Sequence, residues 1–169
     1  DMTIEVICQL DNTPPPAGTV TNLIARYTGA GELEVDNTLY SMELFSTAGT
    51  GNPPYGIRAF WENGAGLDNS FSTANNVSLP PIHNLIFLAQ RRLGNVVQNF
   101  INGVPFGAAS AALNAATGGG NGVFGIGCPA SATITERLVM MSLKIVPSGL
   151  TDLQIAAEYN RTLGPAFGL

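Results

Sequence analysis

Residues 96–107 read VVQNFINGVPFG, so an Asn-Gly pair stands between two short apolar runs. A two-residue turn of type I′ needs a positive φ at both central residues, which Asn tolerates and Gly adopts freely. We therefore predict a β-hairpin in which a strand over 96–101 turns at Asn102-Gly103 into a second strand over 104–106. Most of the remaining chain shows the same pattern of short apolar runs and turns rich in Gly, Pro and Asn.

The composition is that of one globular domain. The chain has 169 residues, of which 45% are hydrophobic, and this length supports a real core. We expect a single domain over residues 1–169. Only 11% of the residues are charged and Lys144 is the one lysine, so Asn, Thr, Ser, Gln and Gly must supply the polarity of the surface. Such a surface is more typical of extracellular lectins, adhesins and virus particles than of cytosolic enzymes.

The charge distribution argues against nucleic acid and membranes as partners. The net charge is −5, and the only adjacent cations are Arg91 and Arg92, so no basic patch is available for phosphates. No apolar run approaches the roughly 18 residues of a transmembrane helix. We expect neither nucleic acid nor a membrane as a partner.

Apolar alternation predicts further strands. In the first of them, Ile4, Val6, Cys8 and Leu10 share one side, and Ile7 is the exception. The apolar run over 82–90 predicts a strand buried on both faces. A long polar, Gly-rich loop is expected over 62–76. The other predicted strands cover residues 3–10, 21–27, 39–45, 55–61, 123–128 and 138–146.

The periodicity changes to that of a helix near the C-terminal end of the sequence. Thr151 can cap a helix, and Gln154 follows three residues later, as in a capping box. Leu150 and Ile155 are spaced for a hydrophobic staple. We predict a helix over about 152–159 with one apolar stripe. The stripe consists of Leu153, Ile155, Ala156 and Tyr159.

Four segments are informative when they are taken in order: HNLIFLA (83–89), FINGV (100–104), VFGIG (123–127) and LTDLQI (150–155). Together they resemble the concanavalin A-like lectin/glucanase family, which includes laminin-G-like domains, with Gln154 where Glu is usual. The resemblance spans nearly the whole chain. It implies an all-β fold, an antiparallel jelly-roll β-sandwich with one short C-terminal helix.

One group of residues has the character of a sugar-binding site. Tyr55 and Trp61 share a predicted strand face beside the long polar loop, to which Asp68 and Asn69 belong. An aromatic ring can stack on the apolar face of a sugar while amides and charged groups bind its hydroxyls. We name Tyr55, Arg58, Trp61, Asp68 and Asn69 as candidate ligand-binding residues. The alternative is that both aromatic rings belong to the core.

Acidic residues suggest two further kinds of site. Glu32, Glu34 and Asp36 alternate, which places neighbouring carboxylates about 6 to 7 Å apart on one strand face, close to the spacing in glycosidases. A solvated edge strand explains the same pattern. Asp36 and Asn37 are candidate calcium ligands, since calcium prefers loop-borne oxygen atoms. The alternative for this pair is ordinary turn chemistry, in which Asx side chains bond their own backbone.

The two cysteines, Cys8 and Cys128, both lie in strand-like runs. They can pair, or each can serve as a small buried hydrophobic residue. The sequence leaves both alternatives open.

These patterns predict a non-catalytic surface recognition module rather than an enzyme. We expect it to bind a glycan or another surface receptor and to be displayed on a virion or cell exterior, with calcium as the one candidate cofactor. The first alternative is a structural decoration protein of a bacteriophage capsid or tail, whose partner is a shell protein. The second is a glycoside hydrolase of the same fold.

Overall fold

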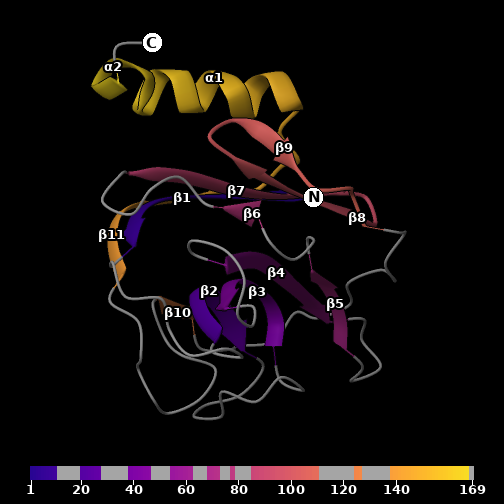
Figure 1. Ribbon diagram of the computed structural model, residues 1–169. Coiled ribbons are helices and arrows are strands. Elements are labelled where there is room, and N and C mark those ends of the chain that lie inside the picture. The colour runs from indigo at the N-terminus through magenta and orange to yellow at the C-terminus, as the bar shows by residue number, and fades with distance from the viewer. Residues whose placement is uncertain are drawn as a thin grey trace.

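The computed structural model is an all-β sandwich of two antiparallel sheets, with a short helix near the C-terminal end (Figure 1). The sequence therefore predicted the fold class correctly. The structure describes residues 1–10, 20–27, 38–46, 54–62, 68–72, 77–78, 85–110, 124–126 and 138–167.

The first sheet has five strands in the order β11-β1-β7-β8-β9. All its neighbouring strands are antiparallel. The strands are β11 (Leu138–Val146), β1 (Met2–Leu10), β7 (Ile86–Leu93), β8 (Val96–Ile101) and β9 (Val104–Phe106).

The second sheet has six strands, five of which follow the order β10-β2-β3-β4-β5, while β6 also pairs with β4. This arrangement places β3 at the centre of the sheet. The strands are β10 (Phe124–Ile126), β2 (Val20–Tyr27), β3 (Thr38–Ser46), β4 (Pro54–Glu62), β5 (Asp68–Ser72) and β6 (Val77–Ser78).

The main core lies between the two sheets. Alternation along β1 directs Ile4, Val6 and Cys8 into it, as the sequence predicted, and Met42 and Ile57 enter it from the opposite sheet. All five side chains are fully buried. Burial of apolar surface at about 25 cal/mol per Å² makes this layer the main source of stability.

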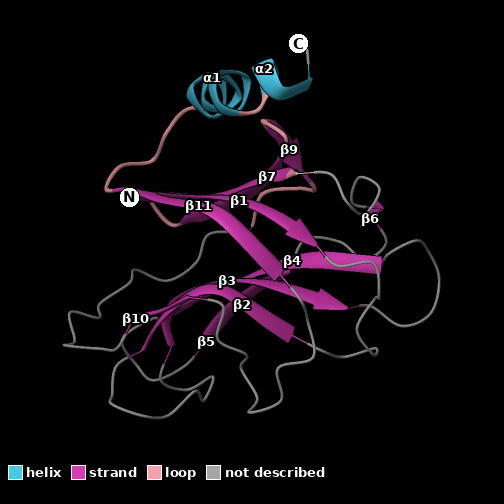
Figure 2. Cartoon of the chain, turned by 90° about the vertical axis from the view of Figure 1, so that its left-hand side faces the viewer, coloured by secondary structure: helices cyan, strands magenta, loops and turns pink. Residues whose placement is uncertain are grey.

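A second apolar cluster lies between the five-stranded sheet and α1 (Asp152–Thr162), which covers the outer face of that sheet (Figure 2). Phe87 and Phe100 from the sheet meet Ile155 from the helix, and Ile7 packs against this cluster. The helix explains why Ile7 breaks the alternation of β1. It also explains why β7 is buried on both faces, as its apolar run predicted.

The helix begins as the sequence predicted. Gln154 N donates to Thr151 Oγ1 (3.2 Å) and Thr151 N donates to Gln154 Oε1 (2.8 Å), which completes the capping box. Two details differ from the prediction. The helix ends at Thr162 rather than near Tyr159, and α2 (Gly164–Phe167) follows it. Leu153 was placed in the buried stripe, but it is 83% exposed because the helix contacts the sheet through Ile155.

The predicted hairpin joins β8 to β9. Asn102 and Gly103 have φ values of 50° and 78°, which are the positive values that this turn requires. Asn102 also joins the turn to β7, since its N donates to Phe87 O (2.8 Å) and its Oδ1 accepts from Phe87 N (3.1 Å). The turn is thereby fixed against the strand that lies beneath the helix.

One predicted loop contains strands. Residues 62–76 were expected to be a loop, but β5 and the end of β4 fall within them. Trp61 pairs with Asn69 and Phe60 pairs with Ser70, so β5 extends the six-stranded sheet at β4. Pairing with a neighbouring strand overrides the turn-forming composition of this segment.

Candidate functional site

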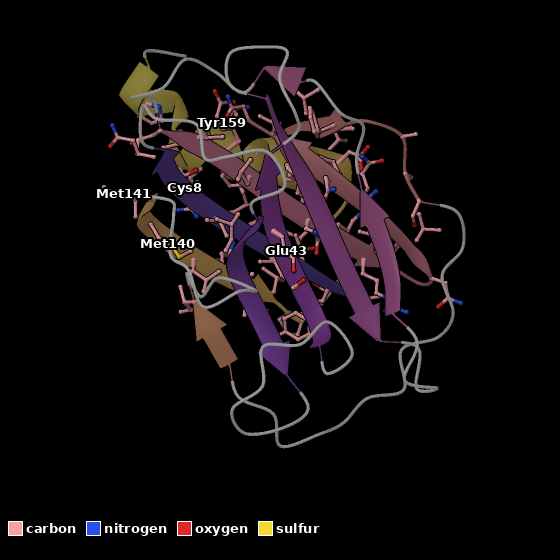
Figure 3. All side chains as sticks on the ribbon, turned by 60° about the horizontal axis from the view of Figure 1, so that its bottom comes forward. Cys8, Glu43, Met140, Met141 and Tyr159 are labelled. Carbon is pink, nitrogen blue, oxygen red and sulfur yellow. The ribbon has the colours of Figure 1, made fainter. Side chains whose placement is uncertain are left out.

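The clearest polar feature of the six-stranded sheet is a Ser-Glu pair on its outer face. Ser41 and Glu43 lie on β3, on either side of Met42, whose side chain is in the core. Alternation therefore directs Ser41 and Glu43 away from the core. Figure 3 views the molecule from this side and shows Glu43 over the middle of the sheet.

Both side chains of this pair are buried, with exposed fractions of 0% for Ser41 and 4% for Glu43. Ser41 Oγ donates a hydrogen bond to Glu43 Oε1 at 3.0 Å. A carboxylate that loses its water needs such donors, because burial of an unpaired charge is costly. The Glu43 carboxylate is therefore held in place near the centre of the sheet face by a hydrogen bond from Ser41 of the same strand, β3.

The backbone register shows which positions lie beside Glu43. Its neighbour on β2 is Asn22 and its neighbour on β4 is Arg58, and Arg58 in turn pairs with Ser72 of β5. Residues directly opposite one another in antiparallel strands have Cβ atoms about 4.5–5.5 Å apart. Glu43 therefore lies between a basic residue on one neighbouring strand, Arg58, and an amide residue on the other, Asn22.

The structure places the five predicted ligand-binding residues on β4 and β5. Trp61 pairs with Asn69, and Asp68 is opposite Glu62. Tyr55 is near the start of β4 and Arg58 is near its middle. The register thus brings all five residues onto two adjoining strands of one sheet.

These five positions divide into two sets according to strand alternation. Arg58 belongs to the set that contains Glu43, because the two residues are directly paired. Trp61 belongs to the set that contains the core residue Ile57, from which it is four positions away on β4. Asp68 belongs to the first set, and Tyr55 and Asn69 belong to the second.

The candidate calcium ligands Asp36 and Asn37 lie outside the described residues, as do Glu32, Glu34, His83 and Cys128. Within the described ranges, no three His, Cys, Asp or Glu side chains come close enough together to hold a metal ion. The calcium expectation therefore stays a prediction.

Sequence reasoning missed Glu43 as a site residue. It stands in the strand SMELF, where it is the single charged residue among apolar and hydroxyl side chains. A lone carboxylate at an outward position of an otherwise apolar strand was the available signal. The sequence could not identify β3 as the central strand, which is what makes the position notable.

A second polar cluster connects the helix to the five-stranded sheet beneath it. Lys144 Nζ of β11 lies 3.3 Å from Glu5 Oε2 of β1 and 3.1 Å from Glu158 Oε2 of α1. Arg161 Nη2 lies 2.7 Å from the same Glu158 oxygen. These ion pairs join β1, β11 and α1, so the cluster holds the helix on the sheet.

Burial and the neighbouring charges shift the pKa values within this cluster. Burial raises the pKa of Glu5, although Lys144 opposes the shift. Hydrogen bonds from Arg161 and then Lys144 lower the pKa of Glu158. For Lys144 burial acts to lower the pKa, but the hydrogen bonds and charges of Glu158 and Glu5 outweigh burial and raise it.

Cys8 is a free thiol in the core, and burial raises its pKa to about 12. A nucleophilic cysteine needs an accessible thiolate, so Cys8 is structural. No helix in the described part of the chain is long and apolar enough to span a membrane.

No protein-family model and no curated protein sequence matches this chain. Solved structures do resemble it. The binding domain of botulinum neurotoxin serotype G superposes with a TM-score of 0.65 at 10% identity, covering 94% of this chain and 35% of that one. The binding domain of serotype D/C gives a TM-score of 0.62 at 12% identity, covering 95% and 36%.

A sialidase from Trypanosoma rangeli gives a TM-score of 0.60 at 15% identity, covering 94% of this chain and 22% of the enzyme. This chain therefore spans well under half the length of each of these solved chains. At such low identity the likeness concerns the fold alone. What the comparisons show is that the chain is similar to all-β, jelly-roll-like folds found in toxin receptor-binding domains and in a sialidase.

Proposed function

We propose that this chain is a non-catalytic recognition module of the concanavalin A-like type, and that it binds a glycan through the outer face of its six-stranded sheet. The observation that carries the proposal is the buried Ser41–Glu43 pair at the centre of that face. Glu43 itself is only 4% exposed, so in this proposal its carboxylate orients the neighbouring polar residues Asn22 and Arg58, and these bind the sugar hydroxyls.

Arg58 and Asp68 extend the proposed site, because they share the alternating set to which Glu43 belongs. Tyr55, Trp61 and Asn69 form the other set, and we propose them as a separate group that can be tested independently. Trp61 is the only tryptophan of the chain, so tryptophan fluorescence reports on the surroundings of this one residue.

Two further observations support a recognition role. Solved neighbours include receptor-binding domains of a toxin. The surface carries few charges, with a single lysine among 169 residues, and this supports display on a virion or cell exterior. An enzymatic role would need a positioned acid/base pair, whereas the hydrogen bond to the Glu43 carboxylate comes from a serine.

A glycan array followed by calorimetric titration of the best ligand tests the proposal. We expect binding above background and a loss of about tenfold or more in affinity for Glu43→Gln, which removes the charge while keeping the shape. Glu158→Gln is the matched control, since it makes the same chemical change on α1, on the other side of the molecule. Thermal melting of both variants separates lost binding from lost folding.

Two outcomes would count against the proposal. Absence of binding to any glycan on the array would reject the carbohydrate ligand. Purification in fixed stoichiometry with a shell protein, together with that absence, would favour a structural decoration protein.

A further inference from the structure

The five-stranded sheet ends in an unusually long edge strand. Strand β11 has nine residues, whereas β9, at the opposite edge, has three. In the part of the chain that the structure describes, β11 pairs with β1 and with no second strand. Figure 2 looks at the molecule from the side of β11 and shows no helix or other strand in front of it.

Strand β11 carries little of the protection that natural sheet edges have. Such edges are usually short or carry charges and prolines that prevent pairing with other chains. Here Met141 is 61% exposed and Ile145 is 38% exposed. The only charged residue of the strand is Lys144, and its ammonium is already bound to Glu5 and Glu158 on the helix side of the sheet.

A bulge raises the exposure of Met141. Cys8 pairs with Met140 and Ile7 pairs with Ser142, so Met141 has no partner on β1. Bulges often protect an edge by twisting it. This bulge instead presents a large apolar side chain at the edge, which favours a partner that covers it.

We propose that β11 is a dimerisation strand, which pairs antiparallel with β11 of a second copy of this chain about a two-fold axis at Leu143. In this register Leu143 is opposite its own copy and Ser142 is opposite Lys144. Met141 of each copy is opposite Ile145 of the other. The two exposed apolar residues thereby cover one another, and the backbone groups of both edges are paired.

The strand's own sequence favours a second copy over another partner. Antiparallel pairing about Leu143 places no two like charges opposite each other, because the lone Lys144 faces a serine. Strand β11 also offers no unpaired charge by which a partner of different chemistry would be selected. A self-complementary apolar edge forms an isologous interface, which is the commonest kind in homodimers.

Sedimentation equilibrium or light scattering over a concentration series tests this proposal. We expect the wild-type chain to reach the mass of two copies below about 100 µM. Met141→Lys and Ile145→Glu should each weaken the dimer by about tenfold or more, because each places a charge opposite an apolar side chain. Leu153→Lys, at an exposed apolar site on α1, should leave the dimer unchanged.

Mixing the two charged variants tests the register itself. In a heterodimer of Met141→Lys with Ile145→Glu, the introduced ammonium and carboxylate are opposite one another, so the mixture should dimerise more tightly than either variant alone. Far-UV circular dichroism checks that each variant is folded. A wild-type chain that stays monomeric throughout, or a dimer unaffected by either variant, would overturn the proposal. A mixture that dimerises no better than its components would overturn the register.

Discussion

Gly103, in the hairpin turn between β8 and β9, lies directly against Tyr159 of α1. A methyl group added at Gly103 would meet Tyr159 Cβ and Ala156 Cα, each at 3.0 Å. The turn that the sequence marks most clearly is therefore also a contact of the helix. One glycine meets two requirements, a positive φ for the turn and the close approach of the helix.

Gly103→Ala should destabilise the fold by about 2 to 4 kcal/mol, since it adds backbone strain to a steric clash with the helix. Gly94→Ala is the matched control. Gly94 also has a positive φ, of 59°, but nothing lies within 4 Å of the added methyl group. It should cost only the strain, about 1 to 2 kcal/mol. Urea denaturation of both variants gives the difference, and equal losses would show that the hairpin does not support the helix.

Glu5 and Glu158 bind the same lysine but should affect stability with opposite signs. Burial raises the pKa of Glu5 above its ordinary value of 4.5, so the folded protein holds this proton more tightly than the unfolded chain. Its contribution favours folding below pH 4.5 and is lost as the pH rises through the folded pKa. Glu5→Gln should therefore match or exceed the wild type in stability at neutral pH.

Glu158 has a lowered pKa, so its contribution is present above pH 4.5 and is lost as the pH falls through the folded pKa. Glu158→Gln should cost about 0.5 kcal/mol at pH 7, and this cost should vanish in acid. Denaturation curves between about pH 3 and 7 check both variants. If the stabilities of Glu5→Gln and Glu158→Gln relative to the wild type changed with pH in the same direction, the opposite signs assigned to the two residues would be contradicted.

Cys8 should not react with a thiol reagent in the folded protein, because its thiol is buried and its pKa is raised to about 12. Alkylation followed by peptide mapping distinguishes Cys8 from Cys128. Labelling of Cys8 should appear only after unfolding in denaturant. Protection that persists in denaturant without reductant, and is lost with it, would instead show that Cys8 is in a disulfide.

Calcium binding at Asp36 and Asn37 is a prediction from the sequence. If it holds, about 1 mM calcium should raise the melting temperature of the wild-type chain relative to a chelator, and Asp36→Asn should remove this shift. Asp152→Asn is the control, because it makes the same chemical change at the start of α1, outside the proposed calcium site, and should leave the calcium-dependent shift in place. An identical melting temperature with calcium and with chelator would exclude a tight site.

Local patterns predicted most of the fold. The Asn102-Gly103 pair, the alternation of β1 and the Thr151–Gln154 capping box each depend on a few neighbouring residues. Strand β5 was missed because the residues DNSFS have turn-forming composition and become a strand only through pairing with β4. Leu153 was wrongly expected to be buried, because the apolar stripe in the sequence is wider than the part of the helix that contacts the sheet.

The candidate site was harder to predict than the fold. Tyr55, Arg58 and Trp61 were correctly assigned to one strand, but their relation to Glu43 depends on the order of strands within the sheet. That order depends on contacts between residues far apart in sequence, which a local pattern does not contain. Likewise, the burial of both faces of β7 and the C-terminal helix were each predicted, whereas the position of that helix over the outer face of β7 was not.

The central claim is that a glycan binds the outer face of the six-stranded sheet around Glu43. Backbone amide shifts of the ¹⁵N-labelled chain, recorded while the best array ligand is added, test it most directly. The account predicts that the largest shifts fall on Ser41, Met42 and Glu43 and on Arg58, while the amides of α1 stay in place. Shifts that cluster on α1 or β11 and spare β3 would contradict it.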